Sequence, residues 1–141
     1  MKDQIRNMMI GAGLAAMLCA PLLKAQDSVE TAKVPFDFHV NNLTLPAGKY
    51  TVMTGSSSNN ATIQLRNDDS GKSILLMPPG RTSGKQDPRL TFHCYGDNCF
   101  LAEMWVPDGP AYTMRKSSLE SEIQKGGSKA TMAYVSLERQ R

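Results

Sequence analysis

Turn-forming residues recur about every 8–12 positions along most of this chain, and that spacing leaves room only for short strands. Clusters of glycine, proline, asparagine, aspartate and serine lie at 46–48, 68–71, 78–80, 96–97 and 107–110. Between them, stretches such as 62–66 alternate apolar and polar residues, which is the period of a half-buried strand. The pattern predicts an all-β fold, either a small β-sandwich or a partly open barrel of about seven strands.

The clearest alternation runs over residues 34–40, which predicts one continuous strand. Phe36 and Phe38 are expected to face the core, and Asp37 and His39 the solvent. One short helix is predicted separately, over residues 117–124.

The predicted helix begins with a capping box, because Ser117 and Glu120 have the spacing at which each side chain satisfies the other's open backbone donor. Two glycines at 126–127 end it. Since so short a helix needs tertiary contacts, Leu119 and Ile123 are expected to pack on the sheet.

The first 25 residues have the layout of a cleavable secretory signal. Lys2 and Arg6 give a positive start, an apolar stretch runs over 8–23, and a polar segment follows Ala25. The alternative is a retained anchor, but this stretch falls short of the roughly 20 residues that a bilayer span needs. We therefore expect export to the periplasm or the extracellular medium, with no membrane attachment after cleavage.

The mature chain is expected to hold a flexible lead-in at 26–32 and a single β domain at 33–138. Loss of the leader, with its three cations and one carboxylate, lowers the net charge from +3 to +1. Lysine and arginine are scattered rather than clustered, so nucleic acid is not an expected partner.

Catalytic and metal-binding patterns are absent from the mature sequence. It has two histidines, His39 and His93, and only Asp37 shares a strand face with the first, whereas zinc takes three or four protein ligands. Neither histidine lies in a nucleophile elbow, and no spacing selects a carboxylate pair. No catalytic residue, metal or cofactor is predicted.

Four aromatic residues are candidates for a binding surface: Tyr95, Phe100, Trp105 and Tyr112. They are compatible with a sugar-stacking platform, but aromatic side chains on neighbouring strands more often pack in the core. The partner of such a surface would be an envelope polysaccharide or an envelope protein.

Cys94 and Cys99 flank a predicted hairpin closed by Gly96 and Asp97. With these two loop residues in a type II′ turn, the cysteines face each other in a non-hydrogen-bonded pair with Cα atoms about 4.5 Å apart. That spacing permits a disulfide, which an oxidising compartment favours over the alternative of two reactive thiols.

Four strings in the mature chain resemble those of an uncharacterised family of small exported bacterial β-rich proteins. They are V-P-F-D-F at 34–38, L-P-A-G-K-Y at 45–50, F-H-C-Y-G-D at 92–97 and K-S-S-L-E-S-E at 116–122. The family has no established activity, so the resemblance implies an exported β domain and assigns no functional residue. Cys94 and Cys99 replace other residues of that pattern, which implies a local reinforcement.

The sequence favours an exported, non-catalytic domain of the bacterial envelope with a structural or binding role. The alternatives are a secreted hydrolase acting on envelope or extracellular polymer, and a small-ligand carrier with an apolar cavity.

Signal cleavage is directly testable. We expect the exported protein to begin at Gln26, because the small Ala25 ends the apolar segment and precedes polar sequence. Intact mass and N-terminal sequencing of the secreted protein measure the cleavage position. A membrane-bound product that begins at Met1 would contradict the prediction.

Overall fold

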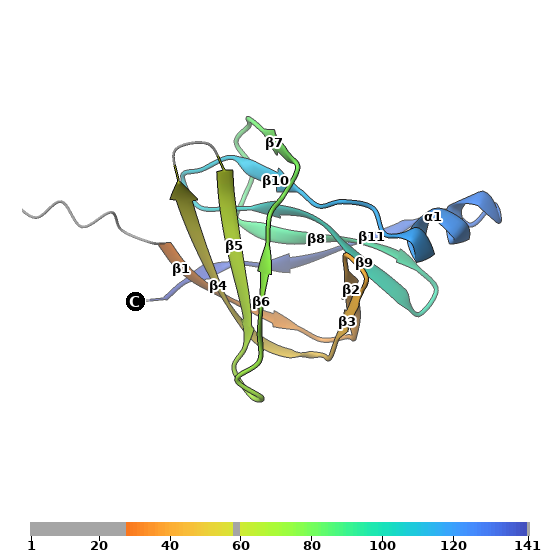
Figure 1. Cartoon of the computed structure of the whole chain (residues 1–141), viewed down its shortest axis with the longest axis horizontal. Coiled ribbons are helices and arrows are strands. Elements are labelled where there is room, and N and C mark those ends of the chain that lie inside the picture. The colour runs from red at the N-terminus through yellow and green to blue at the C-terminus, as the bar shows by residue number, and fades with distance from the viewer. Residues whose placement is uncertain (1–27, 58–59, 141) are drawn as a thin grey trace, which may run out of the picture.

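The computed structural model describes residues 28–57 and 60–140 (Figure 1), so the predicted leader at 1–25 lies outside the described residues. The described chain forms twelve strands and one helix, and this confirms the all-β class. Seven of these strands have four or more residues. In chain order the elements are β1 (Ser28–Val34), β2 (Phe38–Val40), β3 (Leu43–Leu45), β4 (Gly48–Ser57), β5 (Asn60–Asn67), β6 (Ser73–Leu76), β7 (Gly80–Thr82), β8 (Arg89–Tyr95), β9 (Asn98–Trp105), β10 (Ala111–Thr113), α1 (Ser118–Lys125), β11 (Thr131–Ser136) and β12 (Glu138–Arg139).

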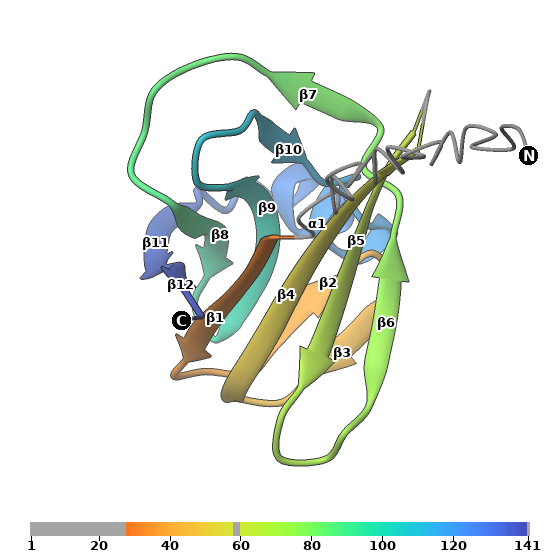
Figure 2. The same cartoon turned by 90° about the vertical axis from the view of Figure 1, so that its left-hand side faces the viewer.

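The strands form two sheets with the core between them (Figure 2). The first sheet has the order β12-β1-β4-β5-β6, and all its pairings are antiparallel. The second has the order β11-β8-β9-β10-β7, and β2 joins it by pairing in parallel with β9 while β3 pairs with β2. No helix in the described part of the chain is long and apolar enough to cross a membrane.

The chain passes from the first sheet to the second at residues 35–37. The prediction of one strand over 34–40 is therefore wrong there, since β1 ends at Val34 and β2 begins at Phe38. Pro35 has no amide hydrogen for a ladder, which suits this crossing. Asp37 is exposed and its carboxylate accepts a hydrogen bond from the Ala47 backbone N–H at 2.8 Å, so it secures the crossing to the next turn.

The predicted flexible lead-in is also wrong for residues 28–32, which belong to β1 and pair with β4. Alternate residues of β1 turn toward the core, and Ala32 and Val34 are buried there. Glu30 occupies the next inward position and is fully buried. This acidic residue at a core position made the segment look like a loop in the sequence.

Three aromatic rings from three strands meet in the core. Phe38 on β2 is completely buried, and its ring centre lies 5.3 Å from that of Tyr50 on β4 and 5.3 Å from that of Phe92 on β8. Phe36, which is half-buried, meets Phe92 edge-on at 5.0 Å. As predicted, both phenylalanines of the V-P-F-D-F string turn inward, and they join the two sheets.

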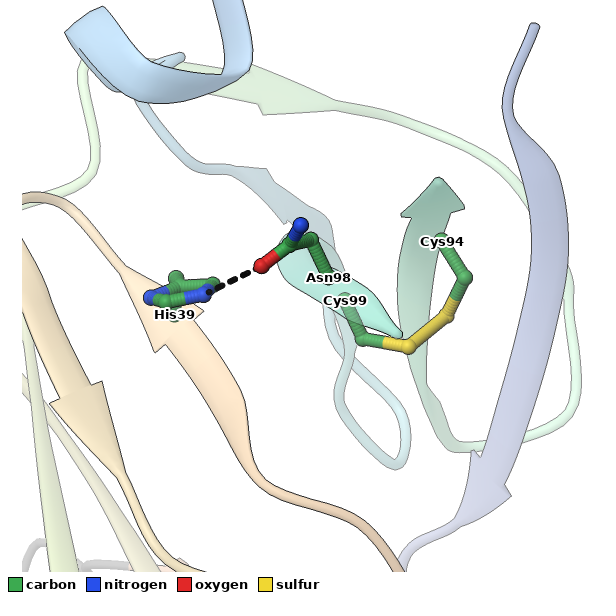
Figure 3. Close-up of a disulfide and its surroundings, with 4 residues drawn as sticks. All are labelled: His39, Cys94, Asn98 and Cys99. Atoms are coloured by element: carbon green, nitrogen blue, oxygen red, sulfur yellow. Dashed lines mark hydrogen bonds between the residues drawn. A yellow bond between two sulfur atoms is a disulfide. The ribbon is translucent and has the colours of Figure 1, made fainter. Parts of the chain in front are cut away.

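The β8–β9 hairpin has the predicted register, with Tyr95 opposite Asn98 and Cys94 opposite Cys99. The two cysteines form a disulfide, and their Cα atoms are 4.0 Å apart (Figure 3). Gly96, the first loop residue, has a φ of 61°, the left-handed value that a type II′ turn requires at this position.

Truncation of the central ring tests this core. Phe38→Ala should lower the free energy of unfolding by about 3–5 kcal/mol, because it removes a buried ring from a packed interior. Leu43→Ala is the control, since Leu43 on β3 is half-exposed to solvent and should cost less than about 0.5 kcal/mol. Urea denaturation measures both, and equal losses would contradict the placement of Phe38.

Candidate functional site

A polar cluster centred on the buried carboxylate of Glu120 holds α1 against the second sheet. The Tyr95 hydroxyl donates to Glu120 Oε1 at 3.1 Å, and His93 Nδ1 lies 3.2 Å from the same oxygen. Gln124 Nε2 donates to the Tyr95 hydroxyl at 2.6 Å. Glu120 is only 4% exposed and is the one buried residue of α1, so the helix is attached through a carboxylate.

The helix cap sets this orientation. Ser117 has extended backbone and its Oγ accepts from the Glu120 N–H at 3.2 Å, which confirms the serine half of the predicted capping box. The other half is wrong, because the Glu120 carboxylate bonds to Tyr95 and His93 rather than to the Ser117 backbone N–H. The predicted packing of Leu119 on the sheet is wrong, because this residue is 44% exposed, and Ile123 is half-buried. A helix that begins at this cap turns Glu120 inward, and the neighbouring Leu119 therefore faces solvent.

Burial raises the pKa of the Tyr95 hydroxyl, and hydrogen bonding to Gln124 offsets part of that rise. Tyr95 therefore stays protonated at neutral pH and can donate to Glu120. Burial likewise raises the pKa of Tyr50, whose hydroxyl donates to the Pro46 carbonyl at 2.5 Å. Both phenols act as hydrogen-bond donors that fix chain segments.

The His93–Glu120 pair resembles the base and orienting carboxylate of a catalytic triad. A triad also needs a nucleophile hydrogen-bonded to the histidine. Within the described residues, no serine, threonine or cysteine forms a hydrogen bond with His93. The arrangement can dock a helix and orient an imidazole, but it contains no assembled nucleophile.

The four aromatic candidates do not form one exposed platform. Tyr95 and Phe100 are buried beside α1 with ring centres 5.9 Å apart. Tyr112 is buried in the core cluster. Trp105 is half-buried, and its Nε1 donates to Glu103 at 3.1 Å. These side chains mainly pack the interior.

His39 and Asp37 do not converge on a common point. The His39 ring stacks on Phe100 at 4.8 Å, its Nδ1 lies 2.9 Å from Thr44 Oγ1, and its Nε2 lies 3.4 Å from Asn98 Oδ1 (Figure 3). His39 is half-buried rather than fully exposed as predicted. Across residues 28–57 and 60–140, no three histidine, cysteine or acidic residues gather as a metal site would require.

A surface groove, here called the α1 groove, lies between the β2–β3 turn and the start of α1. It consists of two adjoining hollows that share Asn41, Asn42, Ser117 and Ser118. One hollow is completed by His39, Thr44, Phe100 and Leu119, and the other by Met77, Arg115 and Lys116. The lining thus combines amides, hydroxyls and two cations, and neither hollow has an acidic residue.

Exposed apolar side chains lie in and beside this groove. Met77 and Leu119, which line it, are 70% and 44% exposed, and Leu43 is half-exposed next to the shared Asn42. A separate hollow lies where β1 meets β11 and β12, and there Lys33 and Lys49 share the lining with Glu138. Of these hollows in the described part of the chain, the α1 groove has cations without a carboxylate in its lining, and it has exposed apolar side chains at its rim.

Sequence reasoning did not find the α1 groove, because its walls come from residues that are far apart in the chain: 39–44, Met77, Phe100 and 115–119. The only local signal was the Asn41–Asn42 pair, in which Asn41 has a left-handed φ of 51°. That conformation marks a tight turn and does not by itself indicate a binding wall.

No family model, curated protein or solved structure matches this chain. The four strings singled out in the sequence make contacts with one another in the fold. Asp37 bonds to Ala47, and His93 and Tyr95 bond to Glu120. These string residues build the structure, and the first four residues of the 116–122 string also line the α1 groove.

Glu120 and Glu122 make a matched pair for testing the docking of α1. Glu120→Ala should lower the free energy of unfolding by about 1–3 kcal/mol, because it removes the buried acceptor of two hydrogen bonds. Glu122→Ala should change it by less than about 0.5 kcal/mol, since this residue is exposed on the same helix. Urea denaturation measures both, and similar effects would show that the polar cluster does not secure the helix.

Proposed function

We propose that this chain is an exported, non-catalytic β domain of the bacterial envelope that acts by binding, in the periplasm or outside the cell. The α1 groove is the observation that carries the proposal. Export is supported by the signal-like first 25 residues and by the Cys94–Cys99 pair, since disulfides persist in oxidising compartments. The resemblance to small exported β-rich proteins agrees with this role.

The groove suits binding better than chemistry. Its polar lining can donate and accept hydrogen bonds, and its apolar rim gives a partner surface to bury. The titratable cluster around Glu120 is occupied in holding α1. The alternative of a hydrolase is favoured only by the contact that orients His93 on Glu120. No nucleophilic side chain among the described residues is hydrogen-bonded to this histidine.

A carrier with an apolar cavity is disfavoured by the interior. The rings of Phe38, Tyr50 and Phe92 meet between the two sheets and fill the space that a ligand would need. Binding at the surface is compatible with this packed core.

Retention on an envelope preparation tests the proposal. The purified mature chain should cosediment with envelope material from the producing bacterium, and a Met77→Asp, Leu119→Asp double variant should bind about tenfold more weakly. The matched control is Met132→Asp, Tyr134→Asp, because these two residues are exposed on β11 and line neither hollow of the groove.

Thermal unfolding followed by circular dichroism verifies that both double variants are folded. Equal loss of retention in the two variants, or no retention of the wild-type chain, would refute binding through the α1 groove.

A further inference from the structure

The edge of the first sheet at β6 is open in the described chain. β6 pairs with β5 on one side and ends the sheet on the other. Its Ser-Ile-Leu-Leu sequence contains no charge and no proline, and Leu75 is 60% exposed. An edge of this kind has unpaired backbone donors and acceptors and is available for pairing with another strand.

The other sheet edges are protected or covered. β12 has only two residues, both charged, and β7 is a three-residue strand that contains Arg81. β11 is longer, but it leads directly into β12 and lies beside β1 (Figure 2). β3 has three residues. Proteins usually protect edge strands by shortness, charge or covering. β6 is also short, but it is one residue longer than β3 and β7 and, unlike β7 and β12, it carries no charge, so among the described edges it is the best suited to accept another strand.

The β6 edge is continuous with the α1 groove. Met77 directly follows β6, and it lines one hollow of the groove together with Arg115 and Lys116. A strand added to β6 and extended beyond Leu76 therefore reaches these two cations.

Positive charge flanks the edge at both ends. Lys72 precedes β6, and Arg115 and Lys116 lie beyond it. The nearest carboxylates in the chain turn toward β4, because Asp68 accepts from Thr51 at 2.7 Å and the Asp69 carboxylate lies next to Gly48. The edge is therefore complementary to an apolar segment that carries acidic residues.

We propose that the partner is an extended peptide segment of another protein, which adds to β6 as an antiparallel strand. The segment is apolar at alternate positions and acidic at its N-terminal end, which lies on Arg115 and Lys116. Antiparallel addition follows from the uniformly antiparallel pairing of this sheet. The inference rests on the proposed binding function and names the chemistry of its partner.

A second copy of this chain fits the edge less well. In a two-fold antiparallel pairing of two β6 strands, Lys72 of one copy approaches Arg115 and Lys116 of the other. These like charges oppose each other, whereas an acidic segment neutralises them.

The probe is a fluorescein-labelled peptide, Glu-Glu-Glu-Val-Thr-Val-Thr-Val, followed by anisotropy against the mature chain. The peptide should bind more tightly than its reverse sequence, whose acidic end lies on Lys72 alone rather than on both Arg115 and Lys116. Raising the salt concentration should weaken binding of the peptide, because salt screens the attraction between its glutamates and the cations of the chain. Leu75→Asp and Arg115→Glu should each reduce binding about tenfold, and the controls Met132→Asp and Lys129→Glu should leave it unchanged.

Backbone pairing has its own readout. Two peptides carry N-methyl groups on alternate amides, one on the valines and one on the threonines. Since alternate residues of a strand turn their amides to opposite sides, only one of the two should lose binding. Equal binding by both methylated peptides, or equal binding by the forward and reverse sequences, would overturn the proposal.

Sedimentation equilibrium distinguishes a second copy of this chain from a peptide partner. A dimer that Leu75→Asp dissociates would assign the edge to a second copy and overturn the peptide partner. If the peptide does not bind, but envelope material retains the wild-type chain and not the Met77→Asp, Leu119→Asp variant, this inference is refuted and the proposed function stands. Failure of retention itself would refute the proposed function.

Discussion

The packing of Phe38 between Tyr50 and Phe92 is the interaction on which the rest of the molecule depends. It lies just after the chain passes from the first sheet to the second, so it fixes the position of β2 relative to both. Because β2 is fixed, the turn at Asn41 and Asn42 stands at a defined place beside the second sheet. One wall of the α1 groove is therefore a consequence of core packing.

The opposite wall depends on the β8–β9 hairpin. β8 provides His93 and Tyr95, which hold Glu120 and hence the start of α1, while β9 pairs with β2. Both walls are thus attached to adjacent strands, and the Cys94–Cys99 disulfide joins those strands near their turn. This cross-link restrains the hairpin to which both walls are attached, which favours a groove that is formed before any partner arrives.

Local sequence patterns predicted what neighbouring residues determine: the hairpin register at Cys94 and Cys99, the Ser117 cap, and the inward direction of Phe38. They did not predict features that depend on distant partners. Glu30 is an acidic residue, which in the sequence alone is typical of an exposed loop. Its burial results from the pairing of β1 with β4 and from the opposing sheet, and local sequence specifies neither. Leu119 looked like the docking residue because apolar character is a local property, whereas the acceptor role of Glu120 requires Tyr95 and His93 from another strand.

The attachment of α1 through hydrogen bonds has a consequence for local stability. Detaching the helix uncovers the rings of Tyr95 and Phe100 but leaves the core between the sheets intact, and water can replace the lost hydrogen bonds. This opening therefore costs less free energy than unfolding the sheets. The amides of α1 should accordingly exchange with deuterium through a local fluctuation, while those of β8 and β9 exchange only on global unfolding. A molecule seated across both walls slows exchange in the helix selectively, and the dynamics of α1 thereby report on occupancy of the groove.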